Sequence, residues 1–166
     1  VGVASFIGTL GMQNIIRGIA YLITGGIPIQ FNNAAGILGG GTINISEELQ
    51  IPFSVVIMFA VYFLGIMITK KTVFGRNLYA VGDNEKSARL SGINTDMTRI
   101  MAFVITGLLA GLVGVINAGN LTTAEASAGT SLEQDCIAAV VIGGISMTGG
   151  EGSIVGILFG AAIMGI

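Results

Sequence analysis

Long apolar runs, separated by short polar segments, constrain the fold of this chain more than any other feature. The clearest run covers residues 51–69, includes Pro52 near its start and ends before Lys70 and Lys71. At 1.5 Å per residue in a helix, its roughly 19 residues reach about 28 Å, close to the thickness of a bilayer core. Proline also suits the first turn of a helix, where its missing N–H is not needed. This run therefore predicts a membrane-spanning helix.

Further stretches extend this pattern. Residues 97–119 form a second apolar run, and Asn94 or Thr95 is placed to cap its start. Residues 3–23 form a third run, which a few polar side chains interrupt. The remainder divides into a broken segment and the start of a last helix: 137–152 and 153–166. We therefore expect an all-α fold, a polytopic transmembrane bundle with about four spanning or partly spanning helices.

Composition supports a membrane protein. Only 10% of the residues are charged and 52% are hydrophobic, whereas a soluble domain carries about 25% charged residues. The 27 glycines suit membrane helices, where glycine lets two backbones approach closely. Both ends of the chain fall inside apolar runs, and its start lacks the features of a signal peptide. We expect residues 1–166 to form part of a larger transmembrane domain.

Basic residues predict the orientation in the membrane. Six of the seven Lys and Arg residues lie between Lys70 and Arg99. Segments 24–50 and 119–153 contain no Lys or Arg, and all of their charged residues are acidic. Cytoplasmic loops of membrane proteins carry an excess of Lys and Arg. We therefore expect loop 70–97 to be cytoplasmic and the loops at 24–50 and 119–136 to face outside.

The chain lacks the side chains of most catalytic or metal centres. It has no histidine, a single cysteine (Cys136) and scattered acidic residues, which leaves no metal cluster and no acid–base pair. The pattern G-x-x-x-x-G-K-[ST], which binds nucleotide phosphates, is also absent. We expect no enzymatic activity, no cofactor and no nucleic-acid partner for this chain.

Within the basic segment, residues 82–92 predict a short helix. Asp83 or Asn84 is placed to cap it, Glu85 and Arg89 are spaced to form an i,i+4 ion pair, and Gly92 suits the position after its end. A helix of about two turns is not stable alone in water, so it must lie against the membrane surface or another protein. A solvated basic loop that only fixes the topology is the alternative.

Two long motifs give this chain a resemblance to a known family. The first is TVFGRNLYAVGDNEKSARLSGIN, from Thr72 to Asn94, and the second is DCIAAVVIGGISMTGGEGSIVG, from Asp135 to Gly156. Together with Thr9-Leu10-Gly11 and Arg17-Gly18 they resemble the permease subunits of bacterial ABC importers for simple sugars of the ribose, galactose and xylose type. The resemblance covers essentially the whole chain, as the C-terminal half of such a permease.

The resemblance implies a location, partners and a role for the short helix. It implies a multi-pass protein of the bacterial inner membrane, embedded in the lipid bilayer. The partners would be an ABC ATPase that binds ATP and Mg²⁺, a second permease copy and an extracellular or periplasmic sugar-binding protein. The short helix would be the cytoplasmic coupling helix that docks into the ATPase. Its residues would be Gly82, Asp83, Asn84, Glu85, Ala88, Arg89, Ser91 and Gly92.

Glycines and polar residues in the predicted spans suggest a packing seam and a substrate pathway. Two sets of glycines repeat every fourth residue, which suits either static helix packing or a moving seam: Gly107 and Gly111, and Gly152, Gly156 and Gly160. Segment 137–152 is either a broken, re-entrant helix along the pathway or an ordinary outside loop. The candidate pathway residues are Asn14, Arg17, Asn117, Gly143, Gly144 and Ser146. For Arg17 the alternative is snorkelling to the interface, and for the asparagines it is hydrogen bonding between helices.

Other functions remain open at this point. A branched-chain amino acid ABC permease has a similar architecture, although an amino acid would favour charged groups along the pathway. A secondary transporter or channel that works without ATP would be expected to carry an acidic residue or histidine within a span, and the clear spans contain none. A membrane-embedded enzyme would need the acid–base groups that this chain lacks.

Overall fold

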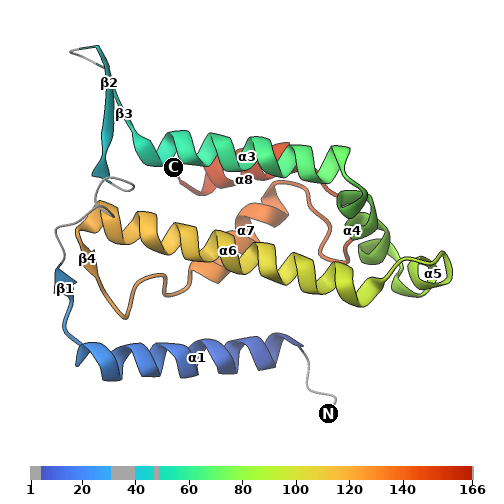
Figure 1. Ribbon diagram of the computed structural model, residues 1–166, viewed down its shortest axis with the longest axis horizontal. Coiled ribbons are helices and arrows are strands. Elements are labelled where there is room, and N and C mark those ends of the chain that lie inside the picture. Colours follow the sequence, from blue (N-terminus) through green and yellow to red (C-terminus); the bar gives the residue numbers. More distant parts are fainter. Residues whose placement is uncertain (1–4, 31–39, 47–48, 166) are drawn as a thin grey trace. The chain divides into compact units, whose positions relative to one another are not determined.

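The structure is a computed structural model that describes residues 5–30, 40–46 and 49–165. In this part of the chain it has seven helices and four short strands, so the fold is mostly helical (Figure 1). The described chain divides into two compact units. Unit 1 contains Val1–Phe53 and Gly114–Thr130, and unit 2 contains Ser54–Val113 and Ser131–Ile166.

Unit 1 combines a long helix with two small strand pairs. Helix α1 covers Ser5–Thr24, close to the predicted run 3–23, whose first residues lie outside the described part. Two antiparallel pairs follow: β1 with β4, and β2 with β3. Their bounds are Ile29–Gln30 and Thr123–Ala124 for the first pair, and Thr42–Ser46 and Leu49–Pro52 for the second.

These strands correct the all-α prediction. The predicted outside loop 24–50 contains β1, β2 and part of β3, and residues 31–39 and 47–48 of that loop lie outside the described residues. A short strand pair satisfies backbone N–H and C=O groups that an irregular loop would have to leave to water. The alternation of Thr42, Ile43 and Asn44 is the period-2 pattern typical of a strand and is the signal that could have found β2.

Unit 2 contains most of the helices. Helix α3 (Phe53–Lys71) and helix α6 (Thr95–Leu121) are its longest, although α6 ends in unit 1. Between them lie α4 (Val73–Asp83) and α5 (Glu85–Leu90). The chain then forms α7 (Leu132–Ile142) and α8 (Ile154–Met164).

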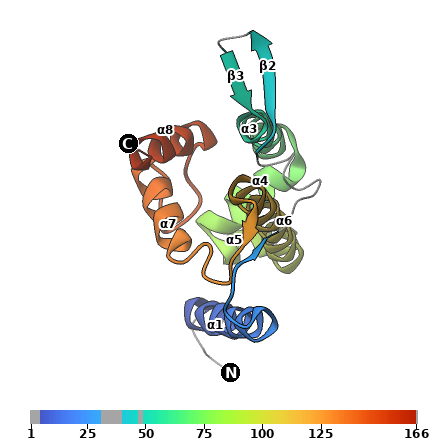
Figure 2. The same cartoon turned by 90° about the vertical axis from the view of Figure 1, so that its left-hand side faces the viewer.

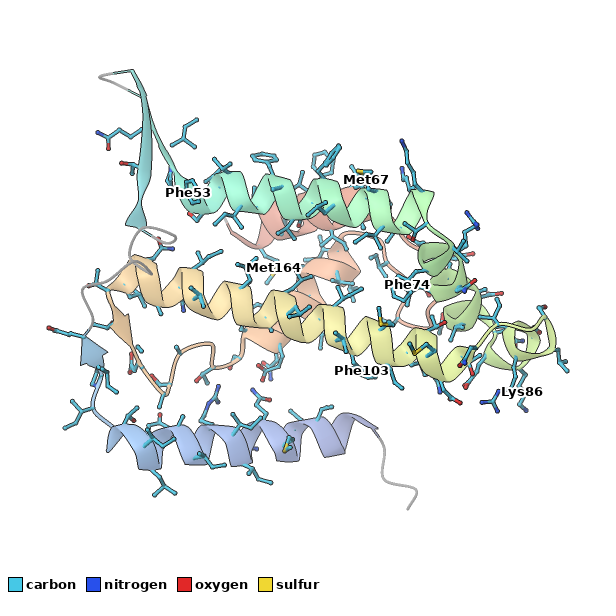
Figure 3. All side chains as sticks on the ribbon, in the orientation of Figure 1. Phe53, Met67, Phe74, Lys86, Phe103 and Met164 are labelled. Atoms are coloured by element: carbon cyan, nitrogen blue, oxygen red, sulfur yellow. The ribbon has the colours of Figure 1, made fainter. Side chains whose placement is uncertain are left out.

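Helices α3 and α6 are the two helices among the described residues that are long and apolar enough to cross a membrane. They match the predicted spans 51–69 and 97–119 to within two residues at each end. The apolar stretch of neither helix is buried within the described chain, and large side chains such as Phe63 and Phe103 are 64% and 70% exposed. Figure 3 labels Phe103 on α6. Such surfaces require lipid or further helices to cover them.

Helices α7 and α8 form a tightly packed helical hairpin (Figure 2). A methyl carbon placed on Gly156 would overlap the carbonyl oxygen of Gly143, and one on Gly160 would overlap that of Ala139. The two backbones are therefore in direct contact, which only glycine permits at these positions. Helix α8 also lies beside α3, where the methyl position of Gly65 faces Ile154 at 3.4 Å.

Candidate functional site

The basic segment folds into two helices that meet at Asn84. Thr72 caps α4 by accepting a hydrogen bond from the N–H of Gly75 at 3.1 Å. Asn84 ends α4, donating its own N–H to the carbonyl of Ala80, and caps α5 by accepting from the N–H of Ser87 at 3.0 Å. The short helix predicted within 82–92 is confirmed as α5, with Asn84 rather than Asp83 as its cap, but it is shorter than predicted because Gly82 and Asp83 form the last turn of α4.

Helix α5 ends at a glycine, as the sequence predicts. Gly92 has a φ of +81°, a left-handed conformation that glycine adopts without the steric cost other residues meet. Its N–H donates to the carbonyl of Arg89, and the N–H of Ile93 donates to that of Ala88, each at 3.1 Å. This pair of bonds is the Schellman arrangement, which satisfies carbonyls left over at a helix end. Gly92 is thus confirmed as the position after the end of α5.

Two ion pairs hold α5 beside the start of α6. Arg99 bonds Glu85 at 2.5 Å, and Arg89 bonds Asp96 at 3.1 Å. The predicted pair between Glu85 and Arg89 is therefore wrong, because the first turns of α6 offer each of them an oppositely charged partner. All four side chains are more than a third exposed, so each pair contributes at most about 1 kcal/mol.

Packing divides α5 into an inner and an outer face. Ala88 is 4% exposed, and Thr95 and Thr98 at the start of α6 are buried as well. Leu90 is 89% exposed, and Lys86 is exposed four residues before it (Figure 3 labels Lys86). Residues four apart share one face of a helix, so a cation and an unburied leucine lie together. Neither Leu90 nor Lys86 was among the predicted coupling residues, and the signal that could have found them is their spacing of four residues on one helix face.

Hydrogen bonds within the loop between α7 and α8 tie its two ends together. Gly144, with a φ of +80°, ends α7 in the same way that Gly92 ends α5. Within the loop the N–H of Ser146 donates to the carbonyl of Glu151 at 3.2 Å, and the hydroxyls of Ser146 and Thr148 lie 2.7 Å apart. We call residues 143–152 the glycine loop.

The glycine loop lies against α4. The hydroxyl of Tyr79 donates to the carbonyl of Gly152 at 3.0 Å. A methyl carbon on Gly82 would lie 2.7 Å from the backbone nitrogen of Gly150, so the two backbones touch. The glycine loop and the end of α4 therefore lie side by side in unit 2. The two alternatives for segment 137–152, a re-entrant helix and an outside loop, stay predictions.

The predicted glycine seams have different surroundings. Gly156 and Gly160 lie against α7, and a methyl carbon on Gly152 would meet the side chain of Ile145 at 2.6 Å. Methyl carbons on Gly107 and Gly111 would meet no described atom within 4 Å. The spacing of four residues therefore accompanies a close contact in α8 and an open face in α6.

The predicted pathway residues fall into two groups. Asn14 and Arg17 on α1 and Asn117 near the end of α6 belong to unit 1. The other three, Gly143, Gly144 and Ser146, belong to unit 2 and lie together at the start of the glycine loop. Ser146 lines a pocket of about 300 Å³ with mostly apolar neighbours: Cys136, Ile137, Val140, Val141, Ile145 and Met147.

Side chains that could bind a metal do not gather in the described residues. No group of three His, Cys, Asp or Glu side chains in this part of the chain could hold a metal ion. Two of the acidic residues within the basic segment, Glu85 and Asp96, are paired with arginines. The assignment of ATP and Mg²⁺ to a partner chain stays a prediction.

Comparison with known proteins gives a family match over the whole chain. The family model described as "Branched-chain amino acid transport system / permease component" matches residues 1–166. No solved structure matches the chain significantly.

Curated relatives match the chain over nearly all of its length. The ribose import permease protein RbsC of Escherichia coli strain K12 is 42% identical over 98% of this chain and 51% of its own length. The xylose transport system permease protein XylH of Haemophilus influenzae is 40% identical over 78% and 35%. The autoinducer 2 import system permease protein LsrC of Salmonella paratyphi B is 38% identical over 96% and 45%. The chain thus spans about half the length of these relatives or less.

Proposed function

The chain belongs to the branched-chain amino acid transport system permease family, and from that premise we propose that it forms part of the membrane permease of an ATP-driven importer for simple sugars. As a member of a permease family it is a polytopic membrane protein, and its long apolar helices α3 and α6 suit that setting. The described units would form half of a larger transmembrane bundle in the bacterial inner membrane, with loop 70–97 cytoplasmic.

A simple sugar is the substrate class that the comparisons and the residues favour. RbsC and XylH are named for ribose and xylose and are about 40% identical to this chain. The candidate polar groups along its helices include Asn14 and Asn117, which offer neutral hydrogen bonds to sugar hydroxyls. A branched-chain amino acid remains the second candidate because the family description names it. A charged substrate of that kind would require charged partners in a membrane interior.

The outer face of α5 is the proposed docking surface for an ABC ATPase. Its components are the exposed Leu90, Lys86 and Arg89, beside the loop residues Ser91 and Gly92. An exposed leucine next to two cations suits a groove that has an apolar floor and an acidic rim. The caps at Asn84 and Gly92 and the two ion pairs with α6 would hold this short helix in shape before it docks.

In the proposed mechanism, ATP binding brings two partner ATPases together and displaces α5. The displacement would reach the spanning helices and switch the permease between outward-open and inward-open states. Two permease copies would enclose the pathway, and an extracellular or periplasmic binding protein would deliver the sugar. The apolar pocket around Ser146 offers weak contacts, as a carrier that must release its substrate requires.

The exposed Leu90 on a capped, two-turn helix is the single observation that carries the docking proposal. The test uses the full-length protein, solubilised from bacterial membranes, with its bound partners identified by mass spectrometry. Wild type should retain an ABC ATPase, whereas a scrambled 82–92 segment and the single change Leu90→Asp should lose it. Val73→Asp is the matched control, because Val73 is a 62% exposed apolar residue on neighbouring α4. Failure of the wild-type protein to retain an ATPase would contradict the proposal.

A further inference from the structure

Helix α4 contacts both α5 and the glycine loop. Asn84 is shared by α4 and α5, so the two helices meet without a linker. One turn earlier, Gly82 lies against Gly150, and Tyr79 reaches Gly152. The proposed docking helix is therefore one helical turn from the loop that joins α7 to α8.

The contact at Gly82 involves backbone on both sides. A methyl carbon on Gly82 would lie 2.7 Å from the nitrogen of Gly150, and one on Gly150 would lie 2.7 Å from the Cα of Asp83. Gly149 and Gly150 also have φ values of +91° and +78°, a region that other residues enter only with strain. With no side chain between the two backbones, no rotamer change can absorb a displacement of α4.

The hydroxyl of Tyr79 fixes the point where α8 begins. Its bond to the carbonyl of Gly152 spans 3.0 Å and joins residues 73 apart in the sequence. Ser153 follows as the residue before α8, and Gly156 and Gly160 in α8 lie directly against α7. A movement of Gly152 would therefore move α8, and α7 with it.

We propose that Tyr79 and Gly82 are positioning residues that transmit movement of α5 to the α7–α8 hairpin. This inference rests on the proposed function and deepens it, because it identifies how docking of an ATPase would reach the pathway residues Gly143, Gly144 and Ser146. The transmitted motion runs from α5 through the end of α4 to Gly150 and Gly152, and then into α8. In this role Tyr79 and Gly82 touch neither the sugar nor ATP.

The test measures sugar transported per ATP hydrolysed by the full-length permease, reconstituted in liposomes with its ATPase and binding protein. Tyr79→Phe removes only the hydroxyl and should lower this ratio about fivefold, the effect of one hydrogen bond of ordinary strength. Gly82→Ala should lower it further, because its methyl group forces the two backbones apart. ATP hydrolysis and ATPase binding should persist in both variants.

Matched controls come from the same chain. Tyr62→Phe removes a hydroxyl that makes no hydrogen bond to the described residues, and Gly114→Ala adds a methyl group with no described atom within 4 Å. Both should keep the wild-type ratio. If wild type is active and Tyr79→Phe keeps the same ratio, the proposed transmission through Tyr79 and Gly82 is wrong, while the proposed function stands. If wild type shows no ATP-dependent sugar transport, the proposed function is wrong, and so is the transmission through Tyr79 and Gly82 that rests on it.

A second readout separates transmission of movement from a structural role. Cys136 is exposed on α7, and its reaction rate with a water-soluble maleimide reports movement of the hairpin when every other cysteine of the full-length protein is replaced by serine. Wild type should show different rates with and without ATP, and Tyr79→Phe should lose that difference. If Tyr79→Phe keeps the full ATP-dependent difference, the inference is wrong.

Discussion

Helices α6 and α8 carry the same glycine spacing in opposite surroundings. Gly107 and Gly111 repeat after four residues in α6, as Gly156 and Gly160 do in α8. In α8 both glycines meet the backbone of α7, whereas in α6 the methyl positions meet no described atom within 4 Å. The spacing thus predicts a flat helix face, but it does not predict whether another helix packs against that face.

The difference has a physical reason. Helix α7 ends at Ile142, and only eleven residues separate it from Ile154 at the start of α8, so a short closed loop returns the chain directly onto α7. Helix α6 has no such neighbour in sequence that packs on its glycine face within the described residues. A membrane helix with an open glycine face suits lipid or another helix of a larger assembly.

The largest expected effect comes from filling the α7–α8 contact. Gly160→Leu places a side chain where the carbonyl oxygen of Ala139 lies and should destabilise the protein by about 3 kcal/mol. Gly107→Leu is the matched control and should cost far less, because no described atom lies near its methyl position. Thermal unfolding of the full-length protein in detergent measures both. Equal losses would break the comparison, since they would show that the α6 face is packed as tightly.

An intermediate effect is expected at the two glycines that end α5 and α7. Gly92 and Gly144 have φ values of +81° and +80°, and a methyl group on either would meet no described atom within 4 Å. Alanine at each position should therefore cost only its backbone strain, about 1 kcal/mol.

The same two variants should differ in function. Gly92→Ala, next to the docking surface, should reduce coupling of transport to ATP hydrolysis, while Gly144→Ala should reduce transport itself. Unfolding midpoints and transport assays on the full-length complex give the two measurements. A loss much greater than that of Gly160→Leu would contradict the account, because it would place an unseen neighbour at these glycines.

The smallest effect on stability is expected at the ion pair between Arg89 and Asp96. The two side chains are 65% and 71% exposed, so Arg89→Ala and Asp96→Asn should each change stability by less than about 1 kcal/mol. Their functional effects should differ, because Arg89 belongs to the proposed docking surface and Asp96 does not. Transport per ATP should fall in Arg89→Ala and stay near wild type in Asp96→Asn. Equal coupling in both variants would remove Arg89 from the docking surface.

Local features of the fold were predictable from the sequence. Length and apolarity predicted α3 and α6, since a spanning helix must contain its own backbone hydrogen bonds. Asn94 caps α6 through the N–H of Met97 at 3.0 Å, and Asn84 caps α5, both in agreement with the alternatives that the sequence offered. Such caps depend on residues close in sequence, which is why the pattern reveals them.

Long-range features were not predictable in this way. The strand pair β1–β4 joins residues almost a hundred positions apart, and the glycine loop meets α4 across a separation of 73 residues. The ion-pair partners of Glu85 and Arg89 also depended on how α6 approaches α5. The polar residues Asn14 and Arg17 remain predictions, because their neighbours along a pathway would come from other parts of the assembly.

Uptake by the reconstituted complex tests the central claim most directly. The full-length permease, with its ATPase and binding protein in sealed liposomes, is offered labelled ribose, xylose and leucine with and without ATP. The account predicts uptake of one of the sugars only when ATP is present, and its loss when segment 82–92 is scrambled. Uptake of leucine in place of sugar would contradict the substrate class, and uptake without ATP would contradict the coupling by α5.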